Sequence, residues 1–210
     1  MPVMQQASSV TSLHADAELA MAAASGVAAS ALRAGARAPL FTLADAGGKP
    51  VELERLLEAG PVVLHFFRGV WCGFGARSLD EFSAACQDVT ALGVSAVAIG
   101  PGGLPGIERD KLPPVIELGD DDMHIARTYG LAFNLPYSLR ARYQQLGYRP
   151  PAGSNGVDDW LVPVPAVYLL DRDGIVVLAA VELDYRKRFD AAPLLGALKA
   201  ISPTKRETRA

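Results

Sequence analysis

Residues 61–100 read PVVLHFFRGVWCGFGARSLDEFSAACQDVTALGVSAVAIG, and this segment decides the fold class. It begins with a continuous apolar run, Pro61–Phe67, which is typical of a strand that is buried on both faces. Apolar residues then recur every three or four positions from about Gly73 to Leu92, a spacing that predicts an amphipathic helix. A second apolar run, Val94–Ile99, predicts another buried strand. Strand, helix and strand in this order indicate a βαβ unit with parallel strands and a right-handed crossover.

The segments around this unit predict antiparallel hairpins and further helices. Strands at Phe41–Leu43 and Val51–Leu53 flank a glycine-containing turn, and strands at Ala166–Leu170 and Ile175–Val181 flank an Asp-Arg-Asp-Gly turn. We also expect a short strand near Val115–Leu118 and helices after Asp120–Asp122, near Ser138–Leu146 and over Ala191–Ile201. The chain is therefore predicted to be an α/β sandwich, with a mixed central sheet and helices on both faces.

The composition is that of one domain with an appended arm. The chain has 210 residues, of which half are apolar and a fifth are charged, so it can build a sizeable core. Residues 1–35 are rich in alanine and predict an N-terminal helical arm, with its helix around Ala15–Arg33. Residues 36–202 are then expected to form the domain, and residues 203–210 a charged flexible tail.

Charge and hydropathy argue against several classes of partner. The net charge is −3 with both signs interspersed, which gives no electrostatic basis for binding nucleic acid or an anionic membrane. No run reaches the roughly 18 apolar residues that a membrane span needs. Met1–Leu13 lacks the basic and apolar regions of a secretory signal, and the chain holds two cysteines. We therefore expect a reducing compartment, the cytoplasm.

Cys72 is the strongest candidate for chemistry. It follows the predicted strand at Pro61–Phe67 and opens the next helix, at the sheet edge where ligands gather in α/β proteins. The N–H groups and the dipole at a helix N-terminus favour a thiolate, and Arg68 is close enough in sequence to add positive potential. The alternative interpretation is an inert buried cysteine beside Trp71.

Cys86 is the other cysteine, and helix geometry argues against its pairing with Cys72. Fourteen residues separate the two. In a continuous helix they lie about 21 Å apart along the axis, whereas a disulfide needs Cα atoms within about 7 Å. Cys86 lies on the apolar face of the helix and is predicted to be a core residue.

Four segments, in this order, resemble motifs of the peroxiredoxin-like proteins, the AhpC/TSA group of the thioredoxin-fold redoxins. Residues 36–43 (ARAPLFTL) resemble a G-x-x-A-P-x-F-x-L opening, and residues 66–72 (FFRGVWC) resemble an F-Y-R-G-x-W-C segment. Residues 161–174 (LVPVPAVYLLDRDG) resemble L-P-V-P-A-T-F-V-I-D-R-D-G, and residues 184–188 (DYRKR) resemble a late P-D-Y-x-x-R stretch. The resemblance covers roughly residues 25–200.

This resemblance implies a thioredoxin-like fold with Cys72 as the reactive cysteine and Pro165 as a cis-proline that faces it. The implied chemistry is attack of the thiolate on a hydroperoxide, which gives a sulfenic acid that another thiol reduces. Arg68 would help to stabilise the thiolate. The residues expected to contact the substrate are Trp71, Gly73, Phe74, Val164 and Pro165.

The sequence departs from the family pattern in three places. The usual C-P-Y-C reads Cys72-Gly73-Phe74-Gly75, so no local disulfide can form. A threonine usually stands three residues before the reactive cysteine, where this chain has Gly69, and another usually follows the proline, where this chain has Ala166.

We therefore predict an oxidoreductase of the one-cysteine peroxidase type. It would reduce hydrogen peroxide or organic hydroperoxides, use an external thiol such as thioredoxin or glutathione, form a homodimer and need no cofactor or metal. Two alternatives stay open at this point. One is a redoxin fold that now serves a non-peroxidase reaction, and the other is a binding protein with a structural Cys72.

The remaining motifs favour structural roles. Gly100–Gly106 follows a strand but lacks the Gly-Lys-Ser/Thr ending of a phosphate loop. Asp120–Asp122 is typical of a helix cap, and Asp171 and Asp173 are typical of a hairpin turn. His65 lies inside a predicted buried strand, where a hydrogen-bonded core histidine is expected, although a role near Cys72 stays open. The aromatic residues near the long loop could wall a substrate pocket or simply pack; they are Tyr137, Tyr143, Tyr148 and Trp160.

Overall fold

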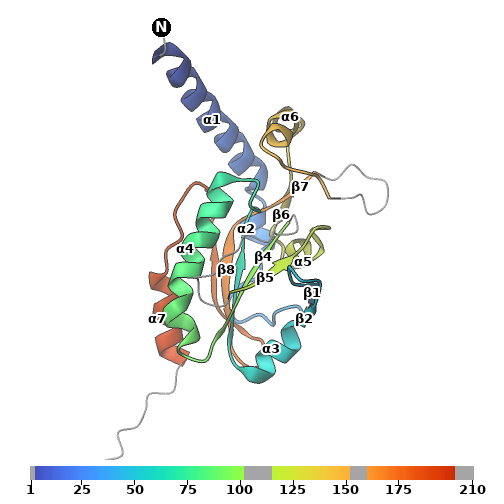
Figure 1. Cartoon of the computed structure of the whole chain (residues 1–210), viewed down its shortest axis with the longest axis vertical. Coiled ribbons are helices and arrows are strands. Elements are labelled where there is room, and N and C mark those ends of the chain that lie inside the picture. Colours follow the sequence, from blue (N-terminus) through green and yellow to red (C-terminus); the bar gives the residue numbers. More distant parts are fainter. Residues whose placement is uncertain (1–2, 102–114, 152–159, 202–210) are drawn as a thin grey trace, which may run out of the picture.

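A five-stranded mixed sheet forms the centre of the molecule (Figure 1). The computed structural model describes residues 3–101, 115–151 and 160–201. The strand order is β5-β4-β3-β8-β9, with the bounds β3 Val62–Phe66, β4 Ser95–Gly100, β5 Val115–Gly119, β8 Ala166–Leu170 and β9 Val176–Val181. Strands β3, β4 and β5 are parallel, whereas β8 and β9 join them as an antiparallel hairpin. The predicted α/β class and the βαβ unit are confirmed.

Strand β3 is the central strand, and all five of its residues are buried. Phe66, its last residue, is paired with Ile99 of β4 and with Ala166 of β8. The backbone N–H of Phe67 adds one more bond to the carbonyl of Ile99 at 3.1 Å. The chain therefore leaves the sheet at a fixed place, just before residues 68–72.

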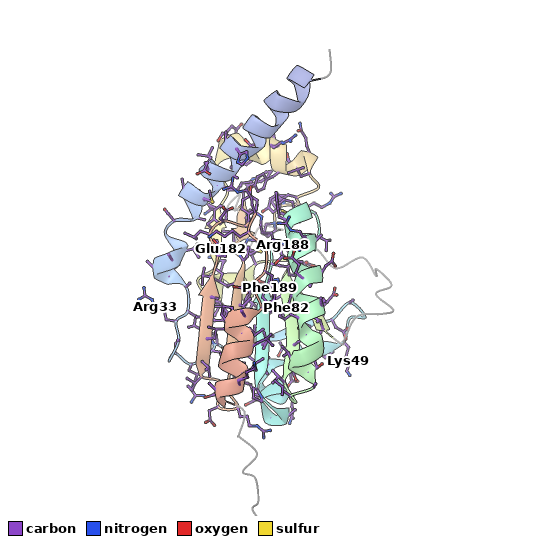
Figure 2. The ribbon with its side chains drawn as sticks, turned by 90° about the vertical axis from the view of Figure 1, so that its left-hand side faces the viewer. Arg33, Lys49, Phe82, Glu182, Arg188 and Phe189 are labelled. Carbon is purple, nitrogen blue, oxygen red and sulfur yellow. The ribbon has the colours of Figure 1, made fainter. Side chains whose placement is uncertain are left out.

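Helices cover both faces of the sheet. Helix α4, Gly73–Thr90, and helix α7, Ala192–Ile201, lie side by side on one face (Figures 1 and 2). Phe82 of α4 is fully buried there, and its ring meets Phe189 edge-on at 5.7 Å (Figure 2). The larger core lies on the other face, beneath α2 Val27–Ser30, α3 Leu53–Ala59 and α5 His124–Thr128.

Two small ribbons flank the central sheet. Strands β1 Thr42–Ala44 and β2 Pro50–Glu52 form the expected first hairpin, each one residue from its predicted place. Strands β6 Ala132–Asn134 and β7 Leu161–Pro163 form a second ribbon that the sequence did not predict, because each contributes only three residues from distant segments. Helix α3 was also missed, whereas α6 Tyr137–Gln145 and α7 lie within one residue of prediction.

The N-terminal arm is a long helix followed by a short one. Helix α1 runs over Val3–Ala24, so it begins earlier than expected and ends before Ser25-Gly26. Ala17, Ala20 and Ala24 are buried, at the three- and four-residue spacing of one helix face. Figure 1 shows the other end of α1 extending beyond the sheet. No helix among residues 3–101, 115–151 and 160–201 is long and apolar enough to cross a membrane.

Candidate active site

Cys72 stands at the junction between β3 and α4, where it is the N-cap residue of the helix. The preceding loop turns at Gly69, whose φ of +96° belongs to the region that favours glycine. A Cβ on Gly69 would also lie only 2.8 Å from the carbonyl oxygen of Pro101. The loop closes with a hydrogen bond from the Cys72 N–H to the Gly69 carbonyl at 3.3 Å. The local backbone therefore excludes the threonine that the family usually has at position 69.

Gly75, in the first turn of α4, is equally restricted. A Cβ at this position would lie 2.5 Å from the carbonyl oxygen of Gly69 and 3.4 Å from the Cβ of Arg68. Real Cβ atoms do not approach backbone so closely, so the helix rests directly on the loop before it. This contact gives a steric reason why position 75 carries no second cysteine.

Cys72 is 7% exposed and lines a cavity of about 420 Å³. Four other residues predicted from the sequence line the same cavity: Arg68, Trp71, Gly73 and Phe74. The opposite wall comes from α6, through Arg142 and Tyr143, and from Tyr185 in the segment after β9. The structure thus brings most of the expected site residues together.

Arg68 is the most unusual side chain in this cavity, because it is charged and only 2% exposed. Its guanidinium lies over the ring of Tyr185 at 3.8 Å and over the ring of Tyr143 at 5.4 Å. One Nη donates to the Tyr143 hydroxyl at 2.9 Å, whereas Nε has no hydrogen-bond partner among the described residues. No described carboxylate pairs with it either. A buried cation without a counter-ion favours an anion beside it.

Tyr185 and its neighbours form the rim next to Arg68. Burial raises the pKa of Tyr185 above its usual range, although the Arg68 charge opposes this shift. Arg186 pairs with Asp184 at 2.7 Å, and its hydrogen bond lowers the pKa of that carboxyl. Arg77 of α4 donates to the Arg186 carbonyl at 2.6 Å. The segment Asp184–Arg188, which resembles a family motif, therefore contributes Tyr185 and Arg186 to the lining of the Cys72 cavity.

The N-terminal arm also reaches the cavity, a contact that the sequence did not predict. His14 and Asp16 of α1 line it. Arg186 lies 3.1 Å from Nδ1 of His14 and 3.4 Å from the Glu18 carboxylate. Asp16 lies 3.9 Å from Nε of Arg142. The sequence carried one signal for this contact: His14 and Glu18 are four residues apart in an alanine-rich stretch, which is the spacing of one helix face.

Pro165 and Val164 are not part of the Cys72 cavity. Pro165 lines a neighbouring cavity of about 200 Å³, which shares the wall made by Arg68, Phe74 and Tyr185. Val164 is buried in the core and donates its N–H to the Leu131 carbonyl at 2.8 Å.

Pro165 was expected to follow a cis peptide bond, and this prediction is wrong. The described residues contain no cis peptide bond, so the bond between Val164 and Pro165 is trans. The chain runs from β7 directly into β8, and the Pro165 carbonyl accepts from Glu182 at 2.9 Å. The trans form, which most X–Pro bonds prefer, fits this path.

His65 is a core histidine, as one interpretation of the sequence had it. It is 1% exposed, its Nε2 lies 3.1 Å from the Ser78 hydroxyl, and its ring stacks on Phe82 at 4.7 Å. Burial lowers its pKa to about 4, so the ring is neutral at pH 7. It lines the smaller cavity and not that of Cys72.

Cys86 is confirmed as a core residue. Its side chain is fully buried in the cluster between the sheet, α4 and α7, and burial raises its pKa to about 12. Both cysteines are free thiols.

The aspartates have the structural roles predicted for them. Asp120 accepts from the N–H groups of Ile125 and Ala126, at 3.0 and 2.8 Å, and so caps α5. Asp171 accepts from Ile175 in the β8–β9 turn at 2.8 Å. Within the described part of the chain, no three histidine, cysteine, aspartate or glutamate side chains cluster as metal ligands.

Of the four aromatic residues considered, only Tyr143 lines the Cys72 cavity. Tyr148 and Trp160 are buried in the core, and Tyr148 meets Trp71 edge-on at 5.1 Å. Tyr137 is 86% exposed. The Gly100–Gly106 segment, for which the sequence did not favour a phosphate loop, lies outside the described residues beyond Pro101.

Comparison with known proteins identifies the family. Residues 34–179 match the AhpC/TSA family. The chain belongs to the AhpC/TSA family. No curated protein sequence matches it.

Solved structures of other proteins share the fold of this chain. The peroxidoxin BcpB from Mycobacterium tuberculosis is 20% identical with a TM-score of 0.59, and the match covers 81% of this chain and 98% of the other. The thiol peroxidase from Chromobacterium violaceum is 18% identical with a TM-score of 0.59, over 81% and 88% of the two chains. This AhpC/TSA member therefore has a thioredoxin-like fold, as the sequence resemblance implied.

Proposed function

We propose that this AhpC/TSA member is a thiol-dependent peroxidase of the one-cysteine type, with Cys72 as its nucleophile. One observation carries the proposal: the Cys72 thiol lines the same cavity as Arg68, a buried cation for which the described residues offer no carboxylate. The N–H groups at the start of α4 and this guanidinium place positive potential beside the sulfur that would attack a peroxide.

In the first step the Cys72 sulfur attacks the terminal oxygen of a hydroperoxide. An S–O bond forms, the O–O bond breaks, and the leaving alkoxide takes one proton from solvent. The sulfur gives up two electrons and becomes a sulfenic acid, while the peroxide becomes an alcohol or water. Arg68 and the N–H groups at the start of α4 stabilise the negative charge that shifts from sulfur to oxygen.

The second step needs a thiol from outside the chain. Cys86 cannot act as the resolving thiol, because it is fully buried and its raised pKa keeps it protonated. One external thiol condenses with the sulfenic acid to give a mixed disulfide and water. A second thiol then releases the Cys72 thiol and leaves as a disulfide.

The test compares reduced wild-type protein with Cys72→Ser and Cys86→Ser variants. Each is mixed with hydrogen peroxide or cumene hydroperoxide, and both peroxide loss and intact mass are followed. We expect the wild type and Cys86→Ser to gain one oxygen faster than a free thiol does, and Cys72→Ser to show no such reaction. Cys86→Ser is the matched control, because it removes a thiol outside the cavity.

A wild type that reacts no faster than free cysteine would overturn the peroxidase function. The observation at Gly75 would then favour the alternative, a redoxin fold that serves another reaction, because the local backbone leaves no room for a second cysteine.

We also infer that the chain works in the cytoplasm as a homodimer. Its two free thiols suit a reducing compartment, and one end of α1 extends beyond the sheet (Figure 1), where a second copy could pack. Light scattering on the full chain would show twice the monomer mass if this is correct.

A further inference from the structure

We propose that the Cys72 cavity selects organic hydroperoxides that carry a carboxylate on an apolar, ring-sized body, and that Arg142 binds this carboxylate. This assignment of the substrate class rests on the peroxidase function proposed above. Size, wall chemistry and charge each support it.

The cavity is far larger than the smallest peroxide needs. Its volume is about 420 Å³, whereas one water molecule occupies about 30 Å³ in the liquid, and hydrogen peroxide has only one more oxygen. Ligand sites of about 300–1,000 Å³ typically hold whole organic molecules. The space beside Cys72 therefore suits a substrate with a body of its own.

The walls of the cavity are largely apolar and aromatic. Trp71 and Tyr143 lie with their ring centroids 5.5 Å apart, and Phe74 meets Tyr185 at 5.7 Å. Leu146 is 45% exposed and Phe74 is 38% exposed, so each leaves apolar surface open to a ligand. Flat walls of this kind suit a ring or a short hydrocarbon body.

Among the arginines that line the cavity, one is both accessible and only weakly paired. Arg186 is bound to Asp184 at 2.7 Å, and Arg77 donates to a carbonyl at 2.6 Å. Arg68 is buried beside the reactive sulfur. Arg77 is as exposed as Arg142, at 42%, but it is held by that hydrogen bond to the Arg186 carbonyl. The side chain of Arg142 makes no hydrogen bond among the described residues, and its only described ion pair is a long one to Asp16 at 3.9 Å. A guanidinium in this state can take a carboxylate in a bidentate pair.

Through Asp16, the N-terminal arm takes part in the selection of the substrate. The Asp16 carboxylate lies 3.9 Å from Nε of Arg142 and lines the same cavity, and it comes from α1. The negative charge of Asp16 therefore opposes a second carboxylate beside Arg142. Removal of the Asp16 charge should strengthen binding of an anion, and removal of the Arg142 charge should weaken it.

Binding is tested first, without any peroxide, by calorimetry on the reduced full chain. The probes are 4-isopropylbenzoate and its neutral analogue 4-isopropylbenzamide. We expect the acid to bind the wild type about two- to fivefold more tightly than the amide, which is the upper part of the range for an exposed ion pair. The Arg142→Gln variant should lose this preference, and the Asp16→Asn variant should increase it. Arg140→Gln is the control, because Arg140 lies on the same helix and does not line the cavity.

Turnover is tested next, with cumene hydroperoxide and its para-carboxylate as substrates. The ratio of their kcat/KM values should favour the carboxylate in wild type and Arg140→Gln, and should fall towards one in Arg142→Gln. Equal affinity for acid and amide, or an unchanged ratio in Arg142→Gln, would overturn the selection while leaving the peroxidase function intact. Binding of the acid without consumption of any peroxide would instead overturn the peroxidase function, and the substrate assignment with it.

Discussion

At the scale of single residues, the site depends on glycines that leave no room for a side chain. Gly69 turns the loop before Cys72, and Gly75 lets the first turn of α4 rest on that loop. These contacts place the thiol at the helix N-terminus beside Arg68. The departures from the family motif at positions 69 and 75 are therefore consequences of local packing.

Substitution of Gly75 by alanine should destabilise the protein by about 1–3 kcal/mol, because the added methyl group overlaps the Gly69 carbonyl. The matched control is Gly73→Ala on the same helix, where a Cβ meets nothing within 4 Å. That variant should be neutral or more stable by up to about 1 kcal/mol. Urea unfolding measures both, and equal effects of the two substitutions would contradict this account of Gly75.

At the scale of elements, helix α1 brings the N-terminal arm into contact with the active site. Its buried alanines pack against the body, and its polar residues His14, Asp16 and Glu18 lie against Arg142 and Arg186. The helix therefore covers part of the cavity that contains Cys72. Access to the thiol should depend on how firmly α1 is docked.

The Ala20→Arg variant should loosen this docking, because Ala20 is 1% exposed and a buried arginine has no partner there. We expect faster modification of Cys72 by a bulky maleimide and faster hydrogen exchange along α1. Ala23→Arg is the control on the exposed side of the same helix and should behave as wild type. An unchanged maleimide rate in a folded Ala20→Arg protein would show that α1 does not limit access.

At the scale of the whole molecule, His65 links stability to pH. It lies in the central strand, in the packed layer between the sheet and α4. Burial lowers its pKa to about 4 from the ordinary value of 6.5, so the unfolded chain binds a proton more readily than the folded one between these values. The contribution of neutral His65 is thus present above about pH 6.5 and is lost as the pH falls towards 4.

Global unfolding should therefore show a loss of up to about 3 kcal/mol between pH 6.5 and 4 that comes from His65. The His65→Gln variant, which does not titrate, should lack this part of the slope even though it is less stable overall. His124→Gln removes an exposed histidine instead and should keep the wild-type slope. Parallel pH profiles for wild type and His65→Gln would rule out this role.

The sequence by itself determined the central βαβ unit, the β8–β9 hairpin and the place of Cys72. These features depend on periodicity and turn chemistry within a few residues, so they are readable from local patterns. Its motifs also indicated the family, and the match over residues 34–179 confirmed that assignment.

Only the tertiary structure decided what surrounds Cys72. Arg186 and His14, which meet at the cavity rim, are 172 residues apart in the chain. The β6–β7 ribbon, the trans bond before Pro165 and the fit at Gly75 likewise depend on neighbours from other elements. Local propensities do not specify such contacts, because they form when whole faces of helices and sheets pack to bury their apolar surface.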